Sequence, residues 1–168
     1  MPSKTRLDLD AFMPYRLSVL TNRVSGAIAR HYSERFGLSI PEWRVMAVLG
    51  QSPGLSARQV AERAAMDKVQ VSRAVQSLLA GKRVTRAAHS QDGRVTHLSL
   101  SANGRVIYRE VVPLALSLEK QFLSVLDAGE RKSLDALLIK LSRQMERMTF
   151  AGAVSSRDNA RTNPSPGP

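Results

Sequence analysis

Four short polar signals mark where helices begin, and they constrain the fold of this 168-residue chain more than any other feature. Each signal places Ser or Asp three residues before Glu or Gln. At that spacing the first side chain accepts a hydrogen bond from the backbone of the third helical residue, whose own side chain reaches back. The four segments are Ser39–Glu42, Ser56–Gln59, Asp67–Gln70 and Asp127–Glu130. Short helices are therefore predicted over 40–51, 57–64 and 68–80, where apolar residues recur at helical spacing.

Longer amphipathic helices are predicted on both sides of this short set. The first covers residues 11–35, and Gly37 behind it suits the left-handed conformation that often ends a helix. The second covers residues 102–126 and contains Pro113. The last continues to residue 150 with Leu and Met at helical spacing.

The two ends of the chain lack this periodicity. We expect residues 1–10 to form a flexible arm. Residues 151–168 are rich in Gly, Ser, Asn and Pro, and we expect them to be a disordered tail. The folded domain is therefore expected over 11–150.

Between the short and the long helices the apolar period changes from helical to alternating. Residues 84–88 and 95–100 alternate as strands do, and Asp92-Gly93 between them is a strong signal for a hairpin turn. The predicted fold class is mostly α (α+β), with one β-hairpin. A helix pair followed directly by a hairpin predicts a winged helix-turn-helix over about 40–100.

The helix over 68–80 has the properties of a recognition helix. Only three residues separate it from the helix before it, and a projection at 100° per residue divides it into two faces. The inner face carries Val71, Ala74, Val75 and Leu78. The outer face carries Val69, Gln70, Arg73 and Ser77, with Lys68 at the exposed start. Gln suits paired hydrogen bonds to adenine, and Arg suits guanine or phosphate.

Positive charge gathers around this helix. The formal net charge is +11, and residues 51–100 alone hold eight basic and three acidic side chains. Such a local excess favours a polyanionic partner, here double-stranded DNA. On the predicted hairpin, Arg86 lies on the stem, with Gln91 and Arg94 near the tip. Ser56 could touch a phosphate, although its main role is expected to be the helix cap.

Residues from about 15 to 148 resemble the MarR family of bacterial transcription regulators. Five segments carry the resemblance: Ser39–Leu49, Leu55-Ser56, Val69–Val75, Asp92-Gly-Arg94 and Leu98–Gly104. The resemblance implies that Asp92 orients Arg94 and that the Arg94 guanidinium enters the minor groove. The chain departs from the family pattern at two places. Gly93 is the second residue of the hairpin signature, which is often basic in the family. Lys82-Arg83 stand just before the first strand, where the family usually has Gly-Leu. Lys82 and Arg83 could contact phosphates instead.

The resemblance also implies a homodimer and a small-molecule effector. The helices over 11–35 and 102–150 would join two subunits, placing two recognition helices on a pseudo-palindromic operator. The effector would be an aromatic acid or a related thioester that releases a repressor from DNA. Candidate effector contacts are Tyr15, Arg16, His31, Tyr32, Trp43 and Arg44. For Tyr32 and Trp43, plain core packing is the alternative.

Several other classes find little support. Cysteine is absent, which excludes disulfides, thiolate metal sites and a thiol redox sensor. No cofactor, metal site or enzymatic motif is predicted, and the three His residues lie in separate elements, with His97 expected on a strand surface. No apolar run approaches the roughly 20 residues that span a bilayer, so a cytoplasmic protein is expected. The main alternative is an architectural protein that binds DNA with little sequence preference.

Overall fold

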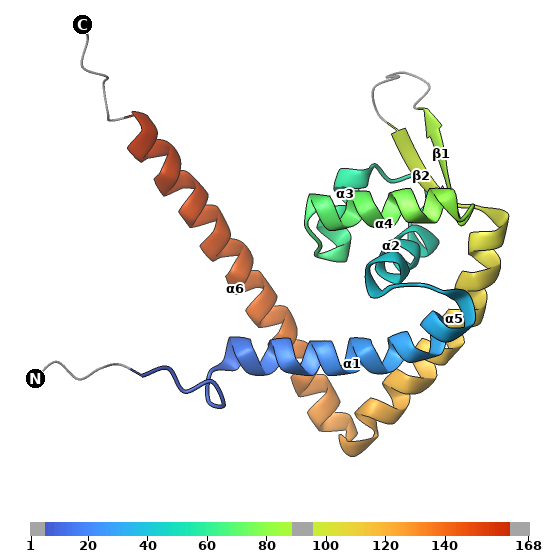
Figure 1. Ribbon diagram of the computed structural model, residues 1–168. Helices are drawn as coiled ribbons and strands as arrows, with labels where there is room; N and C mark the ends of the chain where they lie inside the picture. Colours follow the sequence, from blue (N-terminus) through green and yellow to red (C-terminus); the bar gives the residue numbers. More distant parts are fainter. Residues whose placement is uncertain (1–5, 89–95, 162–168) are drawn as a thin grey trace, which may run out of the picture. The chain divides into compact units, whose positions relative to one another are not determined.

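The computed structural model of the chain describes residues 6–88 and 96–161 (Figure 1). In chain order, the elements are α1 (Met13–Phe36), α2 (Ile40–Gln51), α3 (Ala57–Ala64), α4 (Lys68–Ala80), β1 (Val84–Ala88), β2 (Thr96–Leu100), α5 (Ala102–Phe122), the short 3-10 helix η1 (Leu123–Val125) and α6 (Ala128–Arg161). The chain divides into two compact units, one up to Glu119 and one from Lys120 onward. The predicted mostly helical fold with one hairpin is confirmed. Within the described residues, no helix is long and apolar enough to cross a membrane.

The predicted helix starts of α2, α3 and α4 are confirmed, because local hydrogen bonds determine them. At α2, the Ser39 amide donates to Glu42 Oε2 (2.7 Å), and Ser39 Oγ accepts from the Glu42 amide (3.4 Å). Ser56 and Gln59 form the same reciprocal box at α3. At α4 the predicted box is only half present, since Asp67 Oδ1 accepts from the Gln70 amide (2.8 Å) and no return bond from the Gln70 side chain is present.

A single core lies between α2, α3, α4 and strand β2, with α1 and α5 against it. The predicted inner face of α4 is confirmed, because its four residues are 0–4% exposed. Across from it, α2 contributes Val45, Met46 and Leu49, and α3 contributes Val60 and Ala61. Ala57, in the first turn of α3, is exposed.

The hairpin is anchored to the helical core by its second strand. β1 and β2 pair antiparallel, with Val84 opposite Leu100 and Arg86 opposite Leu98. Leu98 and Leu100 are buried, and the Leu98 amide donates to the Leu55 carbonyl (2.8 Å) in the loop before α3. The Gly54 amide in turn donates to the Leu98 carbonyl (2.9 Å). These bonds place the base of the hairpin beside α3 and α4 (Figure 1).

The ends of the long helices differ from the predictions. α1 begins at Met13 rather than residue 11, because Pro14 suits only the first turn of a helix. α5 ends at Phe122, and Pro113 lies inside it. The largest difference is at α6, which continues to Arg161 although residues from 151 onward were expected to be disordered. That stretch contains several Ala residues and no proline before Pro164, so nothing in the sequence forces the helix to stop.

Candidate nucleic-acid interface

The outer face of α4 presents the predicted recognition side chains to solvent. Lys68, Val69, Gln70, Arg73 and Ser77 are all exposed, whereas the opposite face of the same helix is buried. The cap at Asp67 uses the backbone amide of Gln70, and the Gln70 side chain is exposed on this surface. The first turn of α4 therefore combines a cation, an apolar side chain and an amide within three consecutive residues.

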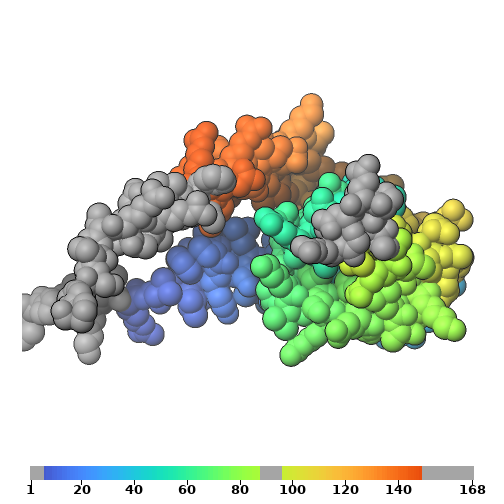
Figure 2. Space-filling model, turned by 90° about the horizontal axis from the view of Figure 1, so that it is seen from above, coloured from blue at the N-terminus to red at the C-terminus, as the bar shows by residue number. Residues whose placement is uncertain are grey.

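The turn between α3 and α4 sets the direction of the recognition helix. Ala65 adopts a left-handed conformation (φ 50°), and its amide donates to the Glu62 carbonyl (3.4 Å). The Met66 amide donates to the Ala61 carbonyl (3.1 Å). These bonds end α3 abruptly, so that α4 starts only three residues later and packs against α3. Figure 2 shows the side chains of the two helices, coloured teal to green, gathered into one continuous surface.

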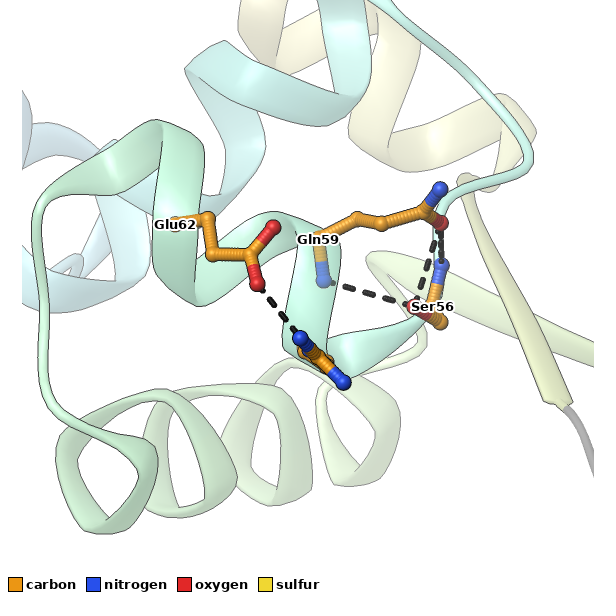
Figure 3. A network of polar contacts seen from close by, with 4 residues as sticks. Ser56, Gln59 and Glu62 are labelled. Carbon is orange, nitrogen blue, oxygen red and sulfur yellow. Dashed lines mark hydrogen bonds and ion pairs between the residues drawn. The ribbon is translucent and has the colours of Figure 1, made fainter. Parts of the chain in front are cut away.

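The exposed side of α3 is occupied by local polar pairs (Figure 3). Ser56 Oγ accepts from the Gln59 amide (3.3 Å) and contacts Gln59 Oε1 (3.1 Å). Ser56 is therefore committed to the helix cap, as expected. Arg58 pairs with Glu62 at 3.0 Å, and both side chains are mostly exposed, so the pair adds little to stability.

On the hairpin, the structure tests one predicted position. Arg86 is exposed on β1, within the strand that follows α4. Gln91, Asp92 and Arg94 lie outside the described residues, and their roles remain predictions.

Lys82 and Arg83, expected to add phosphate contacts, differ from each other. The Arg83 guanidinium is half-buried and donates to the Phe36 carbonyl at the end of α1 (2.5 Å). Arg83 therefore joins the chain just before β1 to the end of α1. Lys82 is exposed and takes the left-handed conformation (φ 53°), while its carbonyl accepts from Ser101 Oγ (2.8 Å). No local pattern pointed to the Arg83 contact, because the partner is 47 positions away.

Glu42 connects the start of α2 with α4, and sequence reasoning assigned it only the cap. The side chain is 8% exposed and accepts from both the amide and the hydroxyl of Ser39. Burial acts to raise the pKa of Glu42, but hydrogen bonds from Ser77 and Ser39, together with the charge of Arg83, lower it below its usual value. Ser77 thus contributes to the pKa of this carboxylate, while its side chain stays exposed on the predicted DNA-facing side of α4, so its role there remains a prediction. Ser77 lies at the boundary of the helix face, next to buried Leu78.

Comparison with known proteins places this geometry in a family. The model of the MarR family matches residues 36–95, which include α2, α3, α4 and β1. A helix-turn-helix transcriptional repressor from Mycobacterium tuberculosis is 28% identical over 131 residues, covering 77% of this chain and 91% of the repressor. The crystal structure of a MarR/EmrR family regulator from Acinetobacter is 27% identical with a TM-score of 0.77, covering 84% of this chain and 99% of that one. The chain is thus similar, in the sequence of residues 36–95 and in fold, to MarR-family transcriptional regulators.

A second solved structure is similar in fold. BpsR from Bordetella bronchiseptica has a TM-score of 0.71 at 23% identity, covering 82% of this chain and 97% of BpsR. Its DNA binding is described as regulated by 6-hydroxynicotinic acid.

The candidate effector residues of the chain fall into two groups. Tyr32 is buried and Trp43 half-buried, with ring centroids 5.6 Å apart, and the Trp43 ring lies 6.0 Å from that of Tyr108. Burial raises the pKa of the Tyr32 hydroxyl to about 12, against a smaller opposing effect of the Arg44 charge. Tyr108, which sequence reasoning did not select, completes this aromatic cluster.

The second group is remote from the aromatic cluster. Tyr15 and Arg16 are exposed in the first turn of α1, and a helical rise of about 1.5 Å per residue puts Tyr15 about 26 Å from Tyr32 along the axis. His31 is exposed next to Tyr32, and Arg44 is half-buried. One protomer therefore does not bring all six candidates together.

The structure also revises His97. It was expected on a strand surface, but it is half-buried, and its ring Nδ1 lies within hydrogen-bonding distance of the Gly54 carbonyl. The ring packs there because β2 is held against the loop before α3. Among residues 6–88 and 96–161, no group of three or more His, Asp or Glu side chains is arranged to hold a metal ion.

Proposed function

We propose that this chain is a MarR-family repressor that binds a pseudo-palindromic operator as a homodimer and is released by a small aromatic acid. The observation that carries the proposal is the two-faced α4, whose inner face is buried while the opposite side offers Lys68, Gln70 and Arg73 to solvent. Side chains in the first turns of such a helix reach base edges when the helix lies in the major groove.

Each residue takes a role that suits its chemistry. Gln70 and Arg73 contact base edges or phosphates in the major groove, and Lys68 and Arg86 contact phosphates. Arg94, oriented by Asp92, enters the neighbouring minor groove, with Gln91 beside it on the hairpin. Ser56 caps α3, so we assign it no base contact, whereas exposed Ser77 keeps its proposed place on the DNA-facing side of α4.

The dimer is supported by a row of apolar side chains that are substantially exposed. On α6 the residues Leu134, Leu137, Leu138, Leu141, Met145 and Met148 lie along one stripe and are 37–59% exposed. An apolar stripe of this length on a soluble helix marks a surface that binds another protein. A second copy of the chain is the natural partner, because a twofold axis brings two copies of α4 to successive turns of the DNA.

The effector is supported by the aromatic cluster of Tyr32, Trp43 and Tyr108 and by the nearby Arg44, which could pair with a carboxylate. BpsR, which shares the fold, responds to an aromatic acid. Effector binding would lower operator affinity, and by linkage operator DNA would lower effector affinity by the same factor.

Fluorescence anisotropy with duplexes selected from a random pool by the full-length protein tests the proposal. Arg73→Ala should weaken binding about tenfold or more, as expected for a base-contacting Arg. Arg109→Ala, which removes an exposed Arg from α5, is the matched control and should leave affinity nearly unchanged. Equal binding by the wild type and Arg73→Ala would contradict the proposed interface.

The architectural alternative is separated by the same assay. An architectural protein would bind selected and random duplexes within a few-fold, whereas a specific regulator prefers its operator by about a thousandfold or more. Measurements at several salt concentrations are needed, because phosphate contacts make all affinities fall with added salt.

A further inference from the structure

Val69 is an exposed apolar side chain in a part of the chain whose other large apolar side chains are buried or half-buried. Its exposed fraction is 60%, and across residues 36–88 and 96–100 it is the one large hydrophobic residue in the exposed class. On the same helix, Val71 and Val75 are 1% and 3% exposed. Core packing therefore does not account for Val69. Helix propensity does not account for it either, since a β-branched residue is a weaker helix former than Ala.

The position of Val69 identifies what such a side chain can contact. It is the second residue of α4, directly after Lys68, and Arg73 lies four positions further along. Residues four positions apart are neighbours on a helix surface, so the Val69 side chain lies beside that of Arg73. The side chain has no hydrogen-bond donor or acceptor. In the major groove, the apolar group that it can contact is the C5-methyl of thymine.

We propose that Val69 determines specificity by contacting the methyl group of a thymine in each operator half-site. The inference rests on the proposed binding of α4 in the major groove and adds the base and the chemical group that are recognised. Because Arg73 is adjacent, the thymine should lie within about one or two base pairs of the base or phosphate contacted by Arg73.

Substitution of thymine by deoxyuridine isolates this contact. Deoxyuridine keeps the base pair and the O4 acceptor and removes only the methyl group. In the operator selected from random duplexes, each thymine is replaced in turn and the affinity of the full-length protein is measured. One thymine per half-site should show a loss of about fourfold, the amount expected for one buried methyl group.

The companion variant is Val69→Ala, an exposed substitution expected to preserve folding. It should weaken binding to the thymine operator about fourfold, and it should show no further loss on the deoxyuridine operator at the sensitive position. Val106→Ala is the matched control, because Val106 is 51% exposed on α5. This control should keep the full deoxyuridine effect.

Two results would overturn the inference while leaving DNA recognition intact. Either no thymine is sensitive to removal of its methyl group, or the losses from Val69→Ala and deoxyuridine add independently. Wild-type protein that fails to prefer its selected duplex over random DNA would overturn the proposed function, and the role of Val69 with it.

Discussion

At the scale of single residues, Glu42 both caps α2 and interacts with α4, the proposed recognition helix. Its side chain closes the α2 cap and receives the Ser77 hydroxyl from α4, with the Arg83 charge nearby. A buried carboxylate is costly unless it is well paired, and here hydrogen bonds and a cation outweigh the cost of burial. Glu42 therefore fastens the recognition helix to α2.

Glu42→Gln should lower the free energy of unfolding by about 1–2 kcal/mol near neutral pH, because it replaces charge-assisted hydrogen bonds with neutral ones. The folded-state pKa of Glu42 is lowered, so the charge contributes stability above the unfolded-state pKa, and that contribution is lost as pH falls through the folded-state pKa. Urea denaturation at neutral and at strongly acidic pH tests this. A difference between variant and wild type that stays constant across the pH range would contradict it.

Lys82 offers a second test at this scale, because it holds a left-handed conformation that favours glycine. Lys82→Gly should raise the free energy of unfolding by about 1 kcal/mol through relief of backbone strain. Lys82→Ala removes the same charge but keeps the strain, so it should show no such gain. Thermal unfolding of the three proteins distinguishes the two effects, and DNA affinity of the two variants measures what the Lys82 charge contributes.

At the scale of elements, the start of α5 is packed tightly against the chain leading into β1. The Ser101 amide donates to the Arg83 carbonyl (3.0 Å), and a Cβ on Gly104 would fall well inside van der Waals contact with that same carbonyl oxygen. Arg35 on α1 also pairs with Glu110 on α5. The hairpin, α1 and α5 are therefore linked, so a change at α5 would be felt at the base of the hairpin.

Gly104→Ala should destabilise the protein by about 2–3 kcal/mol, because backbone atoms must shift to admit the new methyl group. Asn103→Ala is the control, since Asn103 is exposed in the same helical turn and Ala is the better helix former. Chemical denaturation should show a loss for the first variant and a small gain for the second. Similar stability of both variants would show that the chain tolerates the closer approach.

At the scale of the whole molecule, the stripe of Leu and Met on α6 calls for a partner surface. If it joins two copies, a buried charge within the stripe should separate them. Leu141→Glu is therefore expected to convert a dimer into a monomer at micromolar concentration, as measured by analytical ultracentrifugation. Ala136→Glu adds the same charge about 140° away around the helix and should remain dimeric. A monomeric wild type would contradict the proposed assembly.

Local interactions explain why so much of the helix-turn-helix was predictable. The bounds of α2, α3 and α4 depend on caps within three residues and on an apolar period within one helix, and both are visible in the sequence. The same projection correctly separated the buried and exposed faces of α4 for Val69 and Arg73. The end of α6 was less predictable, because helix propensity changes little around residue 150 and the strong stop signal comes only at Pro164.

The sequence by itself determined the helix starts, the faces of α4 and the concentration of positive charge around it, since each depends on neighbours along the chain. Only the tertiary structure decided where Ser77, Arg83 and His97 point. Each of them has a partner more than 30 positions away, Glu42 for Ser77, Phe36 for Arg83 and Gly54 for His97. A polar side chain near the edge of a helix face or on a strand can satisfy its hydrogen bonds in several directions. Packing selects one of them, and here it turned Arg83 inward and left Val69 and Arg73 facing outward.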